Sequence, residues 1–357
     1  MKNIDNILTK EIGKGNSPSI QYIIFNQDNT IYQKQIGYSN IETQQEVNKN
    51  TTFNAFSVTK TFTAIAILQL VKKGKINLDK PAKEYLPDFP YLAEITVRQL
   101  LTHTSGIPNP MPLNWIHLKE EHPEFDRNNF FGKIFRKHTN LKYQPNEKFS
   151  YSNLAYVLLG AIIENISKTT YEKYITTHII EKLEIEDELS FEINTKTHAK
   201  GYHKKRTFMN VVLGLLIDKS KYMNKEKGKW NSFKEYYING ASYGGLVGTP
   251  NAFKIYLQDL LNPNSKLISK EHKALLFTEN STNNNKLTGM CLSWFKGKLN
   301  GNEYYTHAGG GGGYYCEIRI YPELGIGSVL MFNRTRMKDE RLLDKLDKYH
   351  IEKKASR

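Results

Sequence analysis

The residues of this sequence best suited to chemistry are a serine and a lysine three positions apart, Ser57 and Lys60. On a helix, residues three apart lie on the same face, so the lysine amine can approach the serine hydroxyl. A serine hydroxyl is a weak nucleophile until a neighbouring base accepts its proton. The segment Val58–Val71 is apolar on almost every side, which predicts a buried helix that lowers the pKa of Lys60 toward the range of a general base. We therefore predict Ser57 as a nucleophile and Lys60 as its base; the alternative is a helix N-cap followed by a solvent-reaching lysine.

The same serine-lysine spacing also occurs at Ser293 and Lys296, in the run Lys286–Gly297, which reads as a strand. Residues three apart on a strand point to opposite faces of the sheet, so this second pair is not expected to meet.

A different nucleophile is offered by Gly240–Gly244, which has the G-x-S-x-G pattern of an α/β-hydrolase elbow centred on Ser242, with Asp259 and His307 following in the required order. Such an elbow needs a buried parallel strand before it and a helix after it, whereas the loop sequence GLVGTP follows here. Ser242 is therefore retained only as the second alternative.

Tyr151 and Asn153 stand where a turn leads into the apolar helix expected over Asn153–Ile166. A phenol close to an ammonium could ionise partly and share the proton of Ser57, and the Asn153 amide offers both a donor and an acceptor to a substrate amide. The alternative is that this segment only caps the helix.

His307 precedes the glycines Gly309–Gly313 at the end of an expected strand. Taken alone, five consecutive glycines predict a wide hairpin turn. Glycine at a strand edge also lets a ligand approach the backbone, whose N–H groups can hold an oxyanion, so Gly309 and Gly310 are candidate binding residues.

Several classes of protein are disfavoured by composition. The 357 residues are 39% hydrophobic and 24% charged, and the apolar runs Leu154–Ile163 and Phe208–Ile217 are far shorter than a bilayer span of about 20 residues. The formal net charge is +14, but the lysines are spread along the chain, which favours a solvated basic surface over a nucleic-acid partner. Two cysteines, Cys291 and Cys316, predict neither a disulfide framework nor a metal site. The first residues do not read as a signal peptide, so a cytoplasmic location is expected, or a periplasmic or secreted one if the chain is a trimmed mature form.

The elements that must position these residues follow from local pattern. A β-hairpin is expected from Ser19–Asn26 and Thr30–Ile36, and strands from Lys286–Gly297, Glu303–His307, Tyr314–Tyr321 and Gly327–Asn333. Helices are expected at Val58–Val71, Val97–Leu101, Asn153–Ile166, Thr170–Leu183, Thr249–Leu261 and Lys338–Lys353. We predict an α+β fold: residues 1–74 and 235–357 form an α/β layer, residues 75–234 form a mostly helical region, and the active site lies between them.

Five segments in this order carry a family resemblance: FNAFSVTKTFTAIAIL, ITVRQLLTHTSGIP, QPNEKFSYSNLAYVLLGAIIE, ASYGGLVGTP and YYTHAGGGGGYYCEIRIYPELGIGSVLMFN. From Tyr22 to Asn333 the chain resembles the β-lactamase-related serine hydrolases, which include class C β-lactamases, D-Ala-D-Ala carboxypeptidases, D-aminopeptidases and some esterases. The resemblance implies a β-lactamase/transpeptidase-like fold with an antiparallel sheet flanked by helices.

By the same resemblance, Ser57 is the acylated serine, Lys60 and Tyr151 are its catalytic partners, and Asn153 belongs to the substrate-binding Y-x-N element. His307, Ala308 and Gly309 stand for the K-T-G element, and Gly310 supplies an oxyanion-hole amide. His103, in LTHTSG, is interpreted as structural.

The expected activity is hydrolysis of a small amide, peptide or ester through an acyl-enzyme, with no metal or cofactor. The alternative is that the protein is not an enzyme but a catalytically silent family member that binds a cell-wall fragment or a partner protein. His307 departs from the class C pattern, which has lysine there, and a histidine is largely neutral at pH 7 unless a carboxylate raises its pKa. Efficient β-lactam hydrolysis is therefore not expected.

Overall fold

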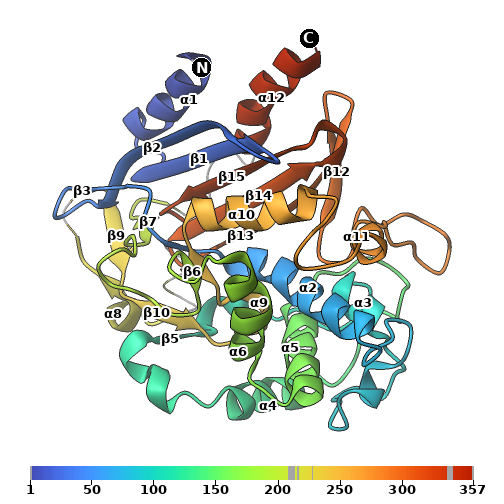
Figure 1. Ribbon diagram of the computed structural model, residues 1–357. Coiled ribbons are helices and arrows are strands. Elements are labelled where there is room, and N and C mark those ends of the chain that lie inside the picture. Colours follow the sequence, from blue (N-terminus) through green and yellow to red (C-terminus); the bar gives the residue numbers. More distant parts are fainter. Residues whose placement is uncertain (1, 208–213, 215–216, 227, 336–340, 356–357) are drawn as a thin grey trace.

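A seven-stranded antiparallel sheet forms one layer of the computed structural model, which describes residues 2–207, 214, 217–226, 228–335 and 341–355 (Figure 1). The strand order is β12-β13-β14-β15-β1-β2-β3. The strands are β1 (Ser19–Asn26), β2 (Thr30–Asn40), β3 (Gln45–Glu46), β12 (Phe295–Leu299), β13 (Asn302–Gly311), β14 (Tyr314–Tyr321) and β15 (Ile326–Phe332). Since β1 pairs with β15, the sheet joins the two ends of the chain.

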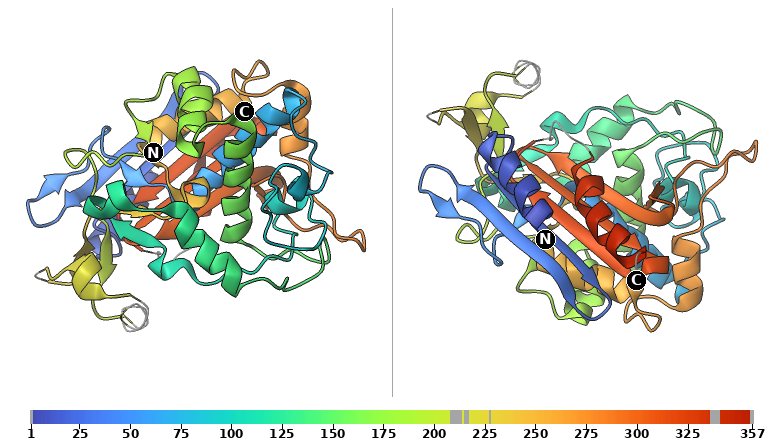
Figure 2. Two further views of the ribbon diagram at one scale, coloured as in Figure 1. Left: turned by 90° about the horizontal axis from the view of Figure 1, so that it is seen from below. Right: turned by 90° about the horizontal axis from the view of Figure 1, so that it is seen from above.

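Both faces of the sheet are covered by other elements. The apolar residues of β1 therefore do not alternate with exposed polar residues along the strand. Ile20, Tyr22 and Ile24 pack in the cluster under α1 (Lys2–Gly13) and α12 (Leu342–Ala355), which lie across the outer face (Figure 2). Ile23 and Phe25 point into the main core on the other face. A strand buried on both sides needs apolar residues at successive positions.

The main core lies between the inner face of the sheet and the helical layer. Its central helix is α2 (Thr59–Lys72), whose residues from Thr59 to Leu68 are all buried. Around it pack α3 (Val97–Leu101), α5 (Asn153–Ser167), α6 (Tyr171–Ile175), α9 (Ala241–Gly244), α10 (Pro250–Leu261) and α11 (Lys270–Leu276), with α4 (Arg127–Lys137) farther out. A helix that is apolar on all sides is stable only when other elements surround it, which explains the central place of α2.

Smaller elements complete the fold. They are the strands β4 (Phe53–Asn54), β5 (Ile116–Leu118), β6 (Leu189–Ser190), β7 (Tyr202–Lys204), β8 (Met223–Asn224), β9 (Trp230–Phe233), β10 (Tyr236–Ile238) and β11 (Val247–Gly248), and the short helix α8 (Lys219–Tyr222). β5 pairs with β10 and thereby links residues that are far apart in the sequence.

Most of the predicted elements are confirmed, including the N-terminal hairpin and the helices α2, α3, α5 and α10. The strand predicted over Lys286–Gly297 is wrong for most of its length: β12 begins only at Phe295, and Ser293 has a φ of 70°. In place of the single helix predicted over Thr170–Leu183, the α-helix α6 ends at Ile175, and a π turn and a 3₁₀ turn follow it.

Other differences concern the chain ends and the middle. The helix α1 was not predicted, and the middle region contains short strands as well as helices. The closing helix is confirmed as α12, while the first residues of its predicted range, 338–340, lie outside the described residues, as does most of the apolar run Phe208–Ile217. The division at residues 74 and 235 stays a prediction.

Candidate active site

Ser57 lies in a 3₁₀ turn, Phe56–Val58, directly before α2. Phe56 has a φ of 48°, a left-handed backbone conformation that is strained for a residue with a side chain. The strand β13 passes against this turn: a Cβ at Gly309 would lie 2.5 Å from the Ser57 nitrogen and 2.2 Å from the Ala55 oxygen. Only glycine allows the two backbones to approach this closely, so Gly309 fixes the edge of the sheet beside the serine.

Lys60 points at the hydroxyl of Ser57. Its Nζ lies 2.9 Å from Ser57 Oγ and donates to the Tyr243 carbonyl oxygen at 2.8 Å. The side chain is fully buried, and this burial lowers the pKa of Lys60 well below its ordinary value, since no carboxylate of the described chain is paired with it. Three tyrosine rings surround the amine, with centres 5.1 to 5.4 Å from Nζ: Tyr151, Tyr156 and Tyr243. Lys60 is therefore placed where a neutral amine can accept a proton from Ser57.

Tyr151 approaches Ser57 from the other direction. Its hydroxyl donates to Ser57 Oγ at 2.9 Å. Burial raises the pKa of Tyr151 above its ordinary value, although the bond to Ser57 opposes the shift. The raised pKa opposes the expected partial ionisation of this phenol, because burial disfavours the phenolate as well as the ammonium meant to stabilise it.

His103 holds the segment that carries Tyr151. Its Nδ1 accepts a hydrogen bond from the Ser152 backbone at 3.1 Å, its carbonyl accepts one from the Ser150 N–H at 2.7 Å, and its ring lies on the Tyr151 ring with centres 4.1 Å apart. The backbone at His103 has a φ of 55°. These contacts fit the structural interpretation of the LTHTSG segment.

Asn153 is the first residue of α5 and borders a pocket beside Ser57. Its backbone N–H donates to Asn109 Oδ1 at 3.0 Å, while its own side-chain Oδ1 is buried without a partner. The pocket has a volume of about 130 Å³. Its lining is Phe56, Ser57, Pro112, Trp115, Ile116, Asn153, Ile217, Phe233, Tyr236, Ile238, Tyr243 and Gly310–Gly312. An orphaned amide oxygen next to the serine is an acceptor available to a substrate N–H.

His307 lies on β13 behind the serine and does not line the pocket. It is 1% exposed, its Nδ1 lies 3.0 Å from the Ala308 carbonyl oxygen, and its Nε2 is buried without a partner. Burial, together with the nearby Lys60, lowers the pKa of His307 to about 3, so the ring is neutral at pH 7. Gly310, in contrast, borders the pocket. The glycines Gly309–Gly311 belong to β13 and only Gly312 and Gly313 form the turn, so the wide hairpin turn predicted for all five is wrong.

The alternative nucleophile Ser242 is not positioned for catalysis. It is 5% exposed in the short helix α9, and its hydroxyl donates to the Tyr156 carbonyl at 2.8 Å. Asp259 is bonded to Ser265 and to the Lys266 backbone rather than to a histidine. The segment instead packs against α2: Thr63 donates to the Ser242 carbonyl at 2.7 Å, and the next carbonyl binds Lys60.

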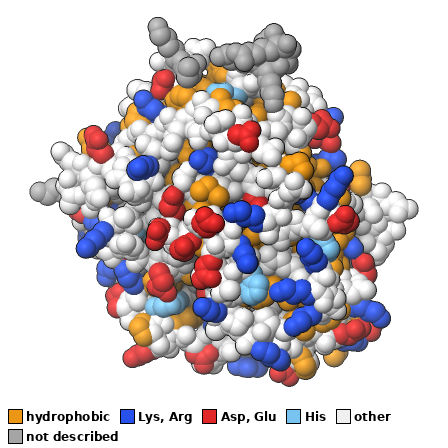
Figure 3. Space-filling view, in the orientation of Figure 1, with side chains coloured by type: hydrophobic (Ala, Val, Ile, Leu, Met, Phe, Trp, Pro, Cys, Tyr) orange, Lys and Arg blue, Asp and Glu red, His pale blue; other side chains and the backbone are white. Residues whose placement is uncertain are grey.

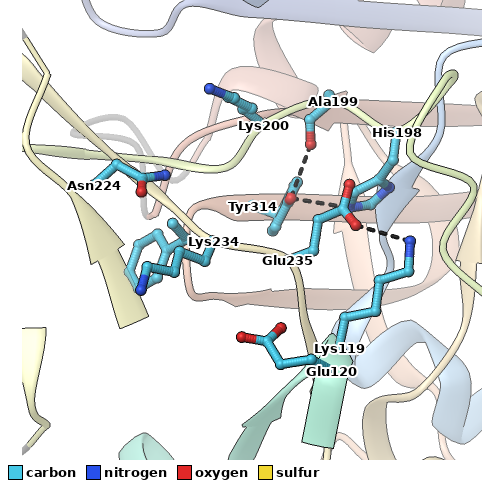
Figure 4. Close-up of a pocket in the computed structure, with 10 residues that line it drawn as sticks. Lys119, Glu120, His198, Ala199, Lys200, Asn224, Lys234, Glu235 and Tyr314 are labelled. Atoms are coloured by element: carbon cyan, nitrogen blue, oxygen red, sulfur yellow. Dashed lines mark hydrogen bonds and ion pairs between the residues drawn. The ribbon is translucent and has the colours of Figure 1, made fainter. Parts of the chain in front are cut away.

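A second, charged pocket of about 490 Å³ lies near the apolar one, and Phe233 lines both (Figure 4). Figure 4 shows Lys119 directed at Glu235, at 2.8 Å, and Tyr314 bonded to Ala199 and His198. None of the ten residues that line this pocket is a serine or cysteine nucleophile. Ser57, which is hydrogen-bonded to Lys60, lines the apolar pocket and not the charged one.

Sequence reasoning missed the Tyr243 carbonyl and the aromatic wall of Trp115 and Phe233. The only signal for the first was that ASYGGLVGTP belongs to the ordered set of family segments. The wall has no local signal, because its residues come from separate loops and short strands.

The fold and this site define the β-lactamase/transpeptidase-like class. The family model described as Beta-lactamase matches residues 4–350, and the chain belongs to this family of serine hydrolases. Protein flp of Staphylococcus aureus (strain MW2) is 27% identical over 344 residues, which cover 92% of this chain and 62% of that protein. The chain thus spans about 62% of the length of this relative.

Two solved structures share the fold. The octameric penicillin-binding protein homologue from Pyrococcus abyssi has a TM-score of 0.75 and 24% identity, covering 93% of this chain and 73% of that one. The D-amino acid amidase from Ochrobactrum anthropi SV3, complexed with L-phenylalanine, has a TM-score of 0.80 and 20% identity, and each chain is covered by 100%.

The described part of the chain has no helix long and apolar enough to span a membrane, and no group of three or more metal-binding side chains was found there. Lys and Arg side chains lie among Asp and Glu side chains on the face in Figure 3, rather than in one patch.

Proposed function

We propose that this protein is a serine hydrolase that forms an acyl-enzyme on Ser57 with a small amide, peptide or ester. One observation carries the proposal: the Lys60 amine and the Tyr151 hydroxyl both lie 2.9 Å from Ser57 Oγ. A nucleophile within hydrogen-bond reach of a base, with a second group in contact, is the arrangement that activates a serine.

In the proposed first step, neutral Lys60 accepts the Ser57 proton while Oγ attacks the substrate carbonyl. The oxyanion of the tetrahedral intermediate is held by the backbone N–H groups of Ser57 and Gly310. Tyr151 then gives its hydroxyl proton to the departing amine or alkoxide, and protonated Lys60 replaces the proton on Tyr151. The lowered pKa of Lys60 and the raised pKa of Tyr151 support Lys60 as the base and Tyr151 as a neutral relay.

In the second step, water attacks the acyl-enzyme, Lys60 takes one of its protons, and Ser57 leaves with a proton restored. Asn153, whose Oδ1 lacks a partner, is proposed to accept a hydrogen bond from a substrate N–H. No step uses a metal or a cofactor. The family and the amidase fold neighbour support an amide or ester bond as the target.

The test is covalent labelling with a fluorescent phosphonate, together with turnover of nitrophenyl acetate. We expect Ser57→Ala to abolish both. Ser242→Ala is the matched control and should keep most of the labelling and turnover, because its hydroxyl only bonds a helix carbonyl. A folded wild-type protein that takes no label would instead support the silent binder of a cell-wall fragment or partner.

A further inference from the structure

The pocket beside Ser57 is apolar almost throughout. Five aromatic side chains form much of its wall: Phe56, Trp115, Phe233, Tyr236 and Tyr243. Trp115 is 4% exposed and is fixed by edge contacts to Phe131 and Tyr243, with ring centres 5.4 and 6.0 Å away. The Tyr236 hydroxyl is occupied, because it donates to the Gly312 carbonyl at 2.8 Å. Trp115 and Tyr236 are therefore held in place, and two polar side-chain atoms of the described lining are buried without a partner: Asn153 Oδ1 and the Tyr243 hydroxyl oxygen.

None of the lining residues in the described part of the chain carries a formal charge. The nearby titratable groups do not supply one either: His307, on β13, is neutral and does not line the pocket, and burial disfavours the charged form of Lys60. The lysines and glutamates of the second pocket lie beyond Phe233. A carboxylate or ammonium in the apolar pocket would lose its hydration without gaining an ionic partner.

The part of the substrate that occupies this pocket is identified by the order of the reaction. The acyl group stays attached to Ser57 after the first step, whereas the leaving group has to reach solvent. A recess that includes Ser57 suits the group that remains. Its volume of about 130 Å³ is close to that of an apolar cavity, about 150 Å³, that binds benzene.

We propose that the pocket selects uncharged, apolar acyl groups up to about the size of a phenyl ring, with Trp115 and Phe233 as specificity-determining residues. The inference rests on the proposed acyl-enzyme function and adds its substrate class. It disfavours acyl groups that carry a carboxylate and free amino acids that carry an ammonium.

The experiment compares nitrophenyl esters that share one leaving group. Nitrophenyl pentanoate and the nitrophenyl half-ester of glutaric acid have the same chain length but end in a methyl group and a carboxylate. We expect kcat/KM to favour the pentanoate at least a hundredfold, because the carboxylate is desolvated without a partner. From acetate to pentanoate, kcat/KM should rise about fourfold for each methylene buried.

The matched variants are Ile238→Lys and Ile238→Met, at a half-buried lining position on β10. Lysine brings a cation to the pocket, so we expect Ile238→Lys to reduce the preference for the pentanoate at least tenfold. Ile238→Met adds similar length without charge and should keep the preference. Trp115→Ala should lower kcat/KM for the pentanoate more than for the acetate, with folding checked by circular dichroism.

The outcomes separate the two proposals. If Ser57 is labelled by phosphonate and both esters are turned over equally, the acyl-pocket inference is overturned while the serine hydrolase stands. Equal kcat/KM values for the acetate and the pentanoate, in an enzyme whose Ser57 is labelled, would likewise overturn only the acyl-pocket inference. If Ser57 takes no label and no ester is turned over, both proposals fail.

Discussion

At the scale of single residues, the site depends on which group near Ser57 holds a proton. Lys60 is buried among three aromatic rings, and Tyr151 is buried beside it. Desolvation lowers the pKa of Lys60 and raises the pKa of Tyr151, because it disfavours the ammonium and the phenolate alike. Burial therefore favours the neutral state of both groups, in which an amine can accept a proton and a phenol can donate a hydrogen bond.

This predicts the pH dependence of activity. A lysine with a lowered pKa is protonated and inactive at low pH and becomes competent as pH rises, so kcat/KM for nitrophenyl acetate should increase along a limb well below the roughly 10.4 of free lysine. Lys60→Arg should lose at least a thousandfold, since a guanidinium stays protonated. An arginine variant with a near-native rate would exclude Lys60 as the base.

His307 offers a second prediction at this scale. Because burial and Lys60 lower its pKa to about 3, it does not change charge between pH 5 and 8. The profile of kcat/KM against pH should therefore keep its shape in His307→Gln, even if the rate falls. A limb near pH 6 to 7 that disappears in this variant would show that His307 titrates in the working range.

At the scale of elements, the proposed catalysis requires β13 to approach the turn before α2 closely. The contact requires glycine: a Cβ at Gly309 would meet both Ser57 N and Ala55 O at less than 3 Å. We expect Gly309→Ala to reduce kcat/KM for nitrophenyl acetate at least a hundredfold, because the serine or the strand has to move. Gly13→Ala is the control, since a Cβ there has no atom within 4 Å and should leave the rate unchanged. Normal activity in Gly309→Ala would mean that the approach of β13 is not needed.

At the scale of the whole molecule, α12 is attached to the sheet by a buried carboxylate. Asp347 accepts hydrogen bonds from Tyr22, Tyr321 and Ser328 at 2.8 to 3.0 Å. Complete burial still raises its pKa to about 6, against the effect of Arg319 and of these donors. The folded state therefore binds a proton more tightly than the unfolded chain.

The sign of the linkage follows from that shift. Asp347 stabilises the fold fully below pH 4 and loses this contribution as pH rises toward about 6, by up to ~3 kcal/mol. Asp347→Asn imitates the protonated form. As pH rises from 4 to 7, the free energy of unfolding of this variant, measured by urea denaturation, should therefore increase relative to that of wild type. Asp28→Asn, at an exposed turn, is the control. A constant difference between Asp347→Asn and wild type across this range would contradict the raised pKa.

The sequence alone determined what depends on local spacing. Ser57 and Lys60 meet because they are three residues apart where a 3₁₀ turn leads into the apolar helix α2, and the hairpin and α5 follow from periodicity and turn residues. The ordered family segments identified Tyr151, Asn153 and the glycine strand as candidates before their positions were known.

Tertiary structure decided what depends on contacts between distant residues. Tyr151 reaches Ser57 across 94 positions, and the carbonyl that binds Lys60 comes from Tyr243, 183 positions away. The raised pKa of Tyr151, the burial of His307 and the apolar wall of the pocket arise only when such segments pack together. The apolar helix indicated the lowered pKa of Lys60, but these three features depend on contacts between distant segments, so no local pattern could have predicted them.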